Sequence, residues 1–473
     1  MTIAVDANAA GFEEAKLARI GEHLRQSYIE PEKIPGCQVL VSRHGIPAYF
    51  ESLGLMDRER SKPMQDDTIF RIYSMSKPIT SVALMMLWEE GRFQLTDPIH
   101  RFIPSWRGQE VWERGEGDKM VTRRPANLPT MQHILSHTAG LTYGGLLPGL
   151  ESPVDQAYQD LGIARGGGET LLEFADKLGR VPLLYDPGHK WCYSLATDVC
   201  GALVEIISGQ PFESFLRERI FDPLGMADTG FRVTDEKLDR FAACYMRSMD
   251  KQVLLEDDPH TSHYRHKRNF FSGGGGLVGT TADYMAFCEM LRQGGQFNGY
   301  QLLGRRTLEL MTANHLMGGK SLAQMALAAF SETANEGVGF GLGFASTLDE
   351  VASCTVGAGD FYWGGRASTI FWVDPEEDLQ VIFMTQLIPS STFNFRGQLK
   401  NIVYLNLDRD INYALIYTSE KLYSFRKYFE KIPSDKLKGS FPKIANKSRF
   451  HNYGKSLIGI SLLVNEDHQV ISS

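Results

Sequence analysis

The sequence predicts an α/β (α+β) protein in which a sheet packs with helices and a mainly helical domain is inserted. Strand patterns lie at both ends of the body of the chain, and helix patterns fill its middle. At 473 residues the chain is also too long for one simple core. We therefore expect a discontinuous sheet domain formed by residues 1–85 and 285–406, a helical domain at 86–284 and a C-terminal tail at 407–473.

Composition and charge narrow the possible classes of function. With 43% hydrophobic and 22% charged residues, the chain has the composition of an ordinary globular protein. Its net charge of −8 disfavours a nucleic-acid partner, because nucleic acids are bound through clustered Lys and Arg. The N-terminus lacks a basic segment followed by an apolar one, and no run of eighteen apolar residues occurs. We expect a cytoplasmic protein without a membrane partner.

The N-terminal part predicts one helix and a pair of strands. Residues 12–29 place apolar side chains at helical spacing, and Pro31 ends that pattern. The stretch CQVLVSRHGIPAYFESLG then predicts two short strands that turn at residues 43–45. An apolar helix follows, starting near Ser74.

The middle of the chain shows helical patterns, whereas the part after about residue 270 shows strand patterns. Helical patterns in the middle are MQHILSHTAG and ATDVCGALVEIISGQ, which end in Gly near a C-cap, and PFESFLRERIFDPLG, which opens with Pro. From FSGGGGLVGTTADY onward, glycine-punctuated strand patterns follow: GFGLGFAST, DFYWGGRASTIFWV and LQVIFMTQL. The helix FRGQLKNIVYLNL closes the body of the chain.

The tail differs from the body in charge. From Asp408 onward it carries about +4, against about −12 for the rest of the chain. A genuine extension, a small extra module and a remnant of cloning or a frameshift all fit this composition, and no role is assigned to the tail.

The pattern S-x-x-K singles out a candidate nucleophile. It occurs four times, beginning at Ser74, Ser248, Ser424 and Ser440. Residues three apart lie on one helix face, so a Ser in the first turn and a Lys one turn later come within hydrogen-bond reach. Only Ser74 leads into a helix apolar enough to run through a protein interior.

Such a site suits nucleophilic catalysis. Desolvation and the positive field of the helix N-terminus both disfavour the ammonium form of Lys77, which makes it a candidate base. The same field stabilises an oxyanion that forms at Ser74. The competing interpretation treats Ser74 as a simple N-cap and Lys77 as a surface residue.

Two further stretches favour the catalytic interpretation. A turn at residues 186–188 delivers Tyr193 just before a well-patterned helix, where its phenol can join the site. In DFYWGGRASTIFWV, Gly364 and Gly365 let a strand backbone approach a ligand closely, as a second oxyanion donor requires. Trp363 would then form a wall of the substrate pocket, or it packs as an ordinary core residue.

The order S-x-x-K, Y-S-x and W-G-G resembles that of the serine β-lactamase and penicillin-binding-protein superfamily. The sequence looks most like the family VIII carboxylesterases, which share the class C β-lactamase fold with its antiparallel sheet. The likeness covers most of residues 12–406 and includes PMQDDTIFRIYSMSKPIT, LSHTAGL, FDPLGMADTGF and SGGGGLVGTTADY.

The resemblance implies roles for individual residues. Ser74 would be the acylated nucleophile, and Lys77 and Tyr193 would share the general-base work. The backbone N–H groups of Ser74 and Arg366 would form the oxyanion hole. Which of Lys77 and Tyr193 takes the proton stays open, because a strongly coupled pair titrates as a unit.

Departures from the β-lactamase pattern bear on the substrate. The asparagine that ends the tyrosine motif in those enzymes is replaced by Leu195, no K-T-G occurs, and Trp363 stands where they carry a cationic Lys. Leu195 and Trp363 are apolar where those enzymes have an amide and a cation. This exchange favours neutral, apolar acyl groups over anionic lactams as substrates.

Other patterns have a structural interpretation. Tyr404 to Asn406 matches Y-x-N but lies on the last helix, and the pair His133 and His137 lacks the Glu of a metalloprotease motif. The loop with His260, His263 and His266 suits a solvated surface better than a metal site. The six cysteines lack C-x-x-C spacing and are expected to be small buried hydrophobic residues: Cys37, Cys192, Cys200, Cys244, Cys288 and Cys354.

The sequence therefore predicts a serine carboxylesterase that acts on small to medium esters with short acyl chains through an acyl-enzyme, with at most weak β-lactam hydrolysis. We expect no cofactor, no metal and a small-molecule ester as partner, and we leave oligomeric state open. Two alternatives remain: an acyltransferase that uses the same acyl-enzyme, and a non-catalytic penicillin-binding sensor or scaffold.

Overall fold

The computed structural model describes residues 3–145, 151–163, 168–326 and 336–407. The described residues all belong to one compact unit. The predicted tail beyond residue 407, with the S-x-x-K matches at Ser424 and Ser440, lies outside the described residues. Within the described ranges, every helix is too short or too polar to cross a lipid bilayer.

An eight-stranded antiparallel sheet organises this unit. Its strands, in order across the sheet, are β12 (Val338–Phe340), β13 (Ala345–Thr347), β14 (Phe361–Gly364), β15 (Ile370–Asp374), β16 (Leu379–Thr385), β1 (Gly36–Arg43), β2 (Ile46–Asp57) and β3 (Lys62–Pro63). All of them come from residues 36–63 and 338–385, which lie inside the two segments predicted to build the sheet. The predicted fold class is confirmed; the domain boundaries stay a prediction.

Apolar sequence places β1 and β16 at the centre of this sheet. Every residue of both strands is buried, which fits their nearly continuous apolar runs. The predicted turn between β1 and β2 falls at His44 and Gly45, whose φ values are 57° and 77°. Positive φ at both central residues matches the right-handed twist of the paired strands, so this tight turn sets their register.

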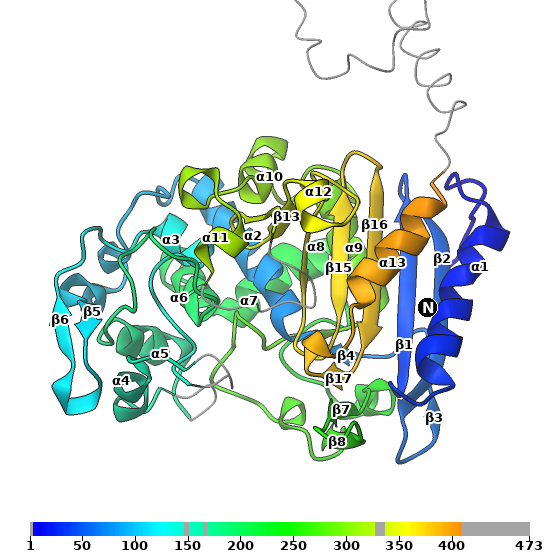
Figure 1. Cartoon of the computed structure of the whole chain (residues 1–473), viewed down its shortest axis with the longest axis horizontal. Coiled ribbons are helices and arrows are strands. Elements are labelled where there is room, and N and C mark those ends of the chain that lie inside the picture. The colour runs from blue at the N-terminus through cyan, green and yellow to red at the C-terminus, as the bar shows by residue number, and fades with distance from the viewer. Residues whose placement is uncertain (1–2, 146–150, 164–167, 327–335, 408–473) are drawn as a thin grey trace, which may run out of the picture. The chain divides into compact units, whose positions relative to one another are not determined.

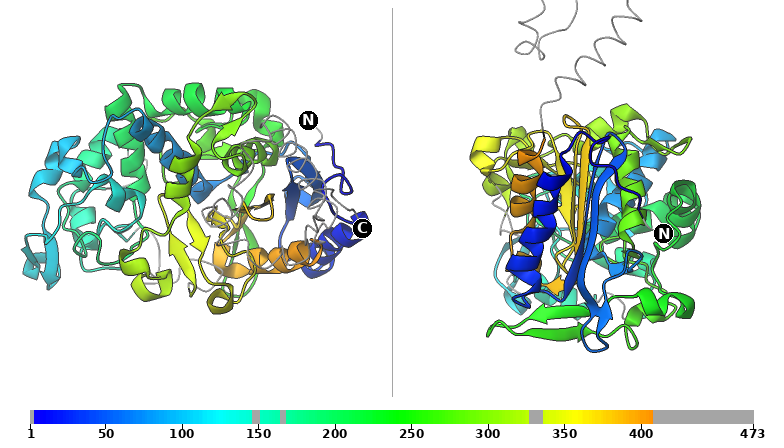
Figure 2. Two further views of the ribbon diagram at one scale, coloured as in Figure 1. Left: turned by 90° about the horizontal axis from the view of Figure 1, so that it is seen from above. Right: turned by 90° about the vertical axis from the view of Figure 1, so that its right-hand side faces the viewer.

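Helices cover both faces of the sheet. Helix α1 (Glu14–Leu24) continues as a π-helical turn at Arg25–Ile29 and packs against α13 (Phe395–Leu405) on one face. Helix α9 (Thr281–Arg292) packs against β15 and β16 on the other. Figure 1 and the right-hand view in Figure 2 show the sheet between these two helical layers.

Helix α2 (Ser76–Glu89) runs through the interior, as its composition predicts. All of its residues from Ser76 to Leu87 are buried, and it packs against α6 (Ala196–Ser208). Helix α6 ends as predicted, with Gly209 in the left-handed conformation at φ 73°. The two helices bring the S-x-x-K segment and the segment after Tyr193 together.

Helix α3 is shorter than MQHILSHTAG predicts. It covers only Met131–Leu135 and ends well before Gly140. The backbone after it bonds elsewhere: the carbonyls of His137 and Gly140 accept from the N–H groups of Cys192 and Leu184. These long-range bonds outweigh the local helical preference, so Gly140 is not a helix C-cap.

The remaining elements are short connections around this frame. Helices are α4 (Asp155–Asp160), α5 (Leu171–Leu178), α7 (Phe212–Leu216), α8 (Asp222–Leu224), α10 (Arg305–Thr312), α11 (Leu322–Met325) and α12 (Glu350–Ser353). Minor strands are β4 (Phe70–Arg71) with β9 (Val278–Gly279), β5 (Val111–Arg114) with β6 (Val121–Arg123), β7 (Cys244–Arg247) with β8 (Val253–Asp257) and β17 (Leu387–Ile388), and β10 (Gln296–Phe297) with β11 (Tyr300–Gln301).

A buried ion pair attaches α13 to the segment that precedes β14. The side chains of Lys400 and Asp360 are 1% and 0% exposed and pair directly. Thr347 donates a second hydrogen bond to the Asp360 carboxylate at 2.6 Å, and Lys400 donates to the carbonyl of Val356 at 3.1 Å. The pair therefore fixes the helix against the sheet beside the late strands.

Replacing Lys400 with methionine is expected to lower the free energy of unfolding by about 3–5 kcal/mol, because Asp360 then stays buried without its cation. Urea denaturation measures this loss. The exposed pair of Lys16 and Glu13 gives a matched control, and Lys16→Met should change stability by no more than about 1 kcal/mol. Equal losses in both variants would contradict the interpretation.

Candidate active site

A strained turn presents Ser74. The chain leaves β4, forms a 3-10 turn at Tyr73–Met75 and enters α2. Tyr73 has φ 42°, a conformation that costs a non-glycine residue free energy and persists only when neighbours enforce it. Its ring packs against Cys244, Ala367 and Ile388.

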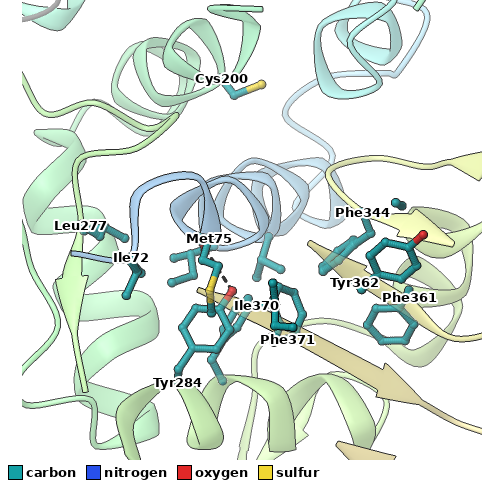
Figure 3. Packing of buried hydrophobic residues seen from close by; sticks show 14 of the residues in the cluster. Ile72, Met75, Cys200, Leu277, Tyr284, Phe344, Phe361, Tyr362, Ile370 and Phe371 are labelled. Carbon is teal, nitrogen blue, oxygen red and sulfur yellow. Dashed lines mark hydrogen bonds between the residues drawn. The ribbon is translucent and has the colours of Figure 1, made fainter. Parts of the chain in front are cut away.

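The core beneath the turn holds it from the other side. Tyr284 on α9 donates a hydrogen bond to the carbonyl of Met75 at 3.0 Å. Figure 3 shows this bond among buried apolar side chains that include Ile370 and Phe371. Burial raises the pKa of Tyr284 well above its ordinary value, so this phenol stays a neutral donor.

Ser74 and Lys77 meet as the S-x-x-K spacing predicts. The ammonium Nζ of Lys77 lies 3.0 Å from Ser74 Oγ. Lys77 is 1% exposed, whereas Ser74 is half-buried. The interpretation of Lys77 as a surface residue is therefore wrong. The remaining S-x-x-K match within the described ranges, at Ser248, falls in the exposed turn between β7 and β8.

Lys77 has two further partners that sequence reasoning missed. Its Nζ donates to the carbonyl of Gly274 at 2.6 Å and to the phenol of Tyr143 at 3.2 Å. Gly274 is fixed in turn, because Asp198 on α6 accepts from its N–H at 3.1 Å and from Ser272 Oγ at 2.5 Å. Hydrogen bonds to Ser74, Tyr143 and Gly274 therefore fix the position of the Lys77 amine.

No sequence motif identified Tyr143 as a site residue. It lies two residues after LSHTAGL, but no fixed spacing ties it to Ser74. The segment from Ser272 to Gly276 gave a clearer signal, since a run of four glycines leaves main-chain carbonyls open to close approach.

Tyr193 lies beside Lys77. The centre of its ring is 4.5 Å from Lys77 Nζ, within the range of a cation–π contact. The indole Nε1 of Trp363 donates to the Tyr193 hydroxyl at 3.4 Å. The ring of Tyr193 also lies 5.3 Å from that of Tyr143. The structure therefore brings Ser74 and Tyr193 next to the amine of Lys77, and Trp363 next to Tyr193.

Aromatic rings surround this group. Trp191 stacks on Tyr193 with ring centres 5.9 Å apart, and Phe340 lies 5.3 Å from Trp363. Trp363 remains partly exposed, while Trp191 and Phe340 are buried. The result is a largely apolar setting around the amine of Lys77.

The double glycine allows two backbones to approach closely. A Cβ atom at Gly365 would lie 2.5 Å from the carbonyl oxygen of Ile72 and 2.2 Å from Thr369 Oγ1, so only glycine fits there. Gly365 donates its N–H to Thr369, and the exposed Arg366 follows in the turn to β15. The end of β14 thus lies directly against the segment that carries Ser74.

Leu195 is placed differently from the other predicted site residues. It is fully buried at the start of α6, and its N–H donates to the carbonyl of Thr142 at 3.2 Å. Ser76 and Ser194 serve local hydrogen bonds, as expected: Ser76 Oγ accepts from the N–H of Leu277, and Ser194 Oγ contacts His137 Nδ1. A direct role for Leu195 in substrate binding stays a prediction.

The remaining candidates have structural partners. His133 forms a capping box with Thr130 at the start of α3, and Tyr404 donates to the Asp374 carboxylate at 2.5 Å. Burial lowers the pKa of His133. Five of the six cysteines are buried as expected. Cys354 is instead exposed, because it ends α12 at the surface in a left-handed conformation.

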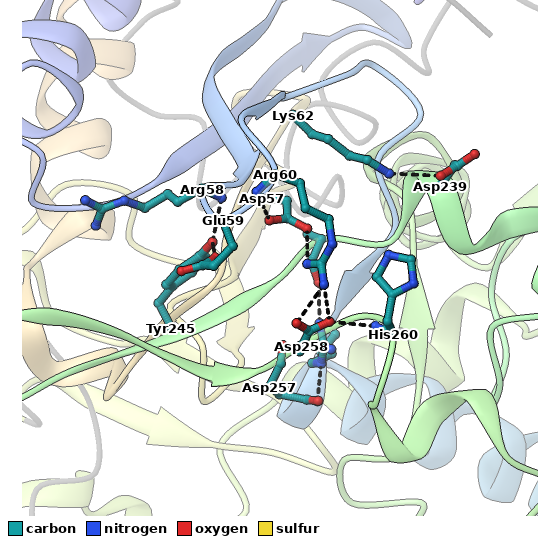
Figure 4. A network of polar contacts seen from close by, with 12 residues as sticks. Asp57, Arg58, Glu59, Arg60, Lys62, Asp239, Tyr245, Asp257, Asp258 and His260 are labelled. Carbon is teal, nitrogen blue, oxygen red and sulfur yellow. Dashed lines mark hydrogen bonds and ion pairs between the residues drawn. The ribbon is translucent and has the colours of Figure 1, made fainter.

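Acidic side chains near the histidine loop pair with arginine. Arg60 donates to Asp57 at 2.7 Å and to Asp258 at 2.8 Å, and His260 adds only its backbone N–H to Asp258 (Figure 4). Among the described residues no cluster of three His, Cys, Asp or Glu side chains could hold a metal ion. The network connects the end of β2 and the turn that follows it to the loop after β8.

Comparisons with known proteins find esterases and acyltransferases among the relatives of this chain. Esterase EstB of Burkholderia gladioli is 30% identical over 404 residues, which cover 80% of this chain and 93% of EstB. ML-236A carboxylate methylbutanoyltransferase mlcH of Penicillium citrinum is 27% identical over 300 residues, or 60% of this chain and 67% of mlcH. The solved structure of EstCE1, described as a hydrolase with promiscuous acyltransferase activity, has a TM-score of 0.68 and 28% identity; the match covers 83% of this chain and 99% of EstCE1.

These relatives confirm the resemblance to the β-lactamase and penicillin-binding-protein superfamily, and EstB and EstCE1 support the likeness to family VIII esterases. The family model described as Beta-lactamase matches residues 22–401, from within α1 to within α13. Because that match spans most of the chain, the protein belongs to the Beta-lactamase family.

Proposed function

We propose that this protein is a serine carboxylesterase that hydrolyses small to medium esters with short acyl chains through an acyl-enzyme on Ser74. One observation carries the proposal: Ser74 Oγ lies 3.0 Å from the amine of a lysine that is 1% exposed. A hydroxyl is a weak nucleophile until an adjacent base takes its proton, and a buried amine next to it is such a base.

The proposed reaction has two steps. Ser74 Oγ attacks the ester carbonyl while its proton passes to the coupled pair of Lys77 and Tyr193. The bond to the alkoxy oxygen then breaks, and the alcohol leaves with that proton. In the second step a water molecule attacks the acyl-enzyme, gives its proton to the same pair and releases the acid, and Ser74 regains a proton.

The oxyanion that forms in each step needs donors already in place. We assign this role to the backbone N–H groups of Ser74 and Arg366. The close approach of Gly365 to the carbonyl of Ile72 supports the assignment, since it places the end of β14 beside the Ser74 turn. The Ser74 N–H also lies just before the start of α2, in the favourable field of that helix.

The apolar surroundings support neutral acyl groups as substrates. The rings of Trp363, Trp191 and Phe340 line the region beside Tyr193, and Leu195 replaces an amide. We expect kcat/KM to be about tenfold or more higher for p-nitrophenyl acetate and butyrate than for the octanoate, and hydrolysis of a chromogenic cephalosporin to be slower still. A preference for the cephalosporin would overturn the esterase proposal.

The two phenols near Lys77 are expected to contribute unequally. Tyr193→Phe should lower kcat by about a hundredfold, because it removes a proposed proton-transfer group. Tyr143→Phe removes one hydrogen bond to Lys77 and should cost about tenfold. Steady-state kinetics on one short-chain ester compares both variants. A larger loss in Tyr143→Phe would reassign the proton transfer to Tyr143.

Acyl transfer is the second candidate function. It is supported by the relative mlcH, an acyltransferase, and by EstCE1, which is described as having acyltransferase activity. Transfer and hydrolysis share the first step, so the same site could perform either reaction. Product analysis with an added alcohol acceptor separates the two activities. Mostly free acid supports the esterase, whereas mostly the new ester supports an acyltransferase.

A further inference from the structure

The segment that follows α3, from His137 to Tyr143, contacts the loop that carries Tyr193. His137 sits in this segment with φ 55°, an uncommon conformation for a residue other than glycine. Its backbone carbonyl accepts a hydrogen bond of 2.8 Å from the N–H of Cys192, the residue before Tyr193. The same segment continues to Tyr143, which contacts Lys77. One short stretch therefore touches both partners of the proposed proton transfer.

The side chain of His137 contacts both the loop and the helix that follows it. Nδ1 lies 3.2 Å from Ser194 Oγ, and Nε2 lies 3.4 Å from Thr197 Oγ1. The ring centre lies 5.0 Å from that of Tyr193, and His137 is 2% exposed. Both ring nitrogens thus contact hydroxyl groups just after Tyr193: Ser194 is the next residue, and Thr197 lies in the first turn of α6.

A neutral imidazole suits this position. Burial, with the nearby charge of Lys77, holds the pKa of His137 well below its ordinary value. A neutral ring offers one donor and one acceptor, and hydroxyl groups can serve as the partner of either. Trp191 and Phe340 close the remaining sides of the ring, with centres 6.0 Å and 5.6 Å away.

We propose that His137 is a positioning residue for catalysis: its contacts to Ser194 and Thr197 and its packing on Tyr193 fix the Tyr193 ring against Lys77. The inference rests on the proposed serine-esterase function. His137 itself touches neither Ser74 nor Lys77 through any hydrogen bond in the described structure. Its effect on the reaction passes through the geometry of Tyr193.

The first test replaces the imidazole. His137→Phe keeps an aromatic ring but removes both polar contacts. We expect kcat for a short-chain ester to fall about tenfold to a hundredfold with KM changed less than about twofold, because proton transfer depends on small displacements. His137→Asn keeps a polar group near the Nδ1 position and should recover part of the lost kcat. His133→Gln is the matched control: it preserves the capping box of α3 and should keep wild-type kcat.

A second variant separates contact from backbone strain, since Phe and Asn differ in how well they accept a positive φ. Ser194→Ala combined with Thr197→Val leaves His137 in place and removes both of its partners. It should reproduce the loss in kcat at nearly unchanged KM. Wild-type kcat in this double variant would overturn the proposal, even if His137→Phe failed to fold.

The outcome also distinguishes the two proposals. If wild-type protein turns over the ester and Ser74→Ala does not, the proposed function stands whatever the His137 variants do. If wild type and Ser74→Ala react equally, the proposed function fails. The positioning role fails alone when Ser74 is required but His137→Phe keeps full kcat.

Discussion

Replacing Ser74 with alanine is expected to lower kcat for a short-chain p-nitrophenyl ester by about 10⁴-fold or more. The substitution removes the atom that we propose forms the acyl-enzyme, and triad-type sites lose nearly all covalent catalysis when their nucleophile is removed. Labelling by a phosphonate should disappear with the same change. Steady-state kinetics and intact-mass measurement on wild type and variant give both results.

Ser76 provides the matched control for this experiment. It lies two residues away in the same S-M-S-K stretch, is fully buried and accepts a hydrogen bond from the N–H of Leu277. Ser76→Ala should keep phosphonate labelling and stay within about tenfold of wild-type kcat. Labelling that depends on Ser76 while Ser74→Ala remains active would contradict the assigned nucleophile. Stable acylation of Ser74 without release over hours would instead favour a non-catalytic sensor.

Replacing Lys77 is expected to have the next largest effect. Lys77→Met should lower kcat by about 10³-fold, because it removes the amine 3.0 Å from Ser74 Oγ and leaves no adjacent base of that kind. The carbonyl of Gly274 and the phenol of Tyr143 also lose their donor. The rate of phosphonate labelling should fall in parallel with kcat, since both depend on activation of Ser74.

Lys77→Arg distinguishes a base from a fixed positive charge. Arginine keeps the cation and can still donate to Gly274, but it does not lose its proton at accessible pH. If Lys77 acts as a base, Lys77→Arg should be nearly as slow as Lys77→Met. Recovery of kcat to within about tenfold of wild type would show that charge suffices and would move the base role to Tyr193.

Short-range patterns in the sequence were enough to predict the Ser74 and Lys77 pair. Residues three apart at the start of a helix lie on the same face, and this relation does not depend on tertiary contacts. The same holds for the turn at His44 and Gly45, where local backbone preference and strand pairing agree. The late strands were predictable because glycine and apolar runs alternate there.

Contacts that cross the chain were harder to foresee. Tyr143 reaches Lys77 from 66 residues away, and no local pattern records such an approach. The early end of α3 has the same origin, since His137 bonds to Cys192 and not to the next helical turn. Leu195 aligned with a binding position in related enzymes, yet its burial follows from how α6 packs and not from its own residue type.

The pairing of β1 with β16 has a consequence for biosynthesis. Cys37 lies opposite Thr385, so the centre of the sheet joins strands separated by nearly the whole body of the chain. A ribosome must deliver β16 before β1 gains that neighbour, and until then an apolar edge stays open. Loop closure over such a distance slows folding. We therefore expect folding of the nascent chain to finish late and to benefit from chaperones that shield β1 during synthesis.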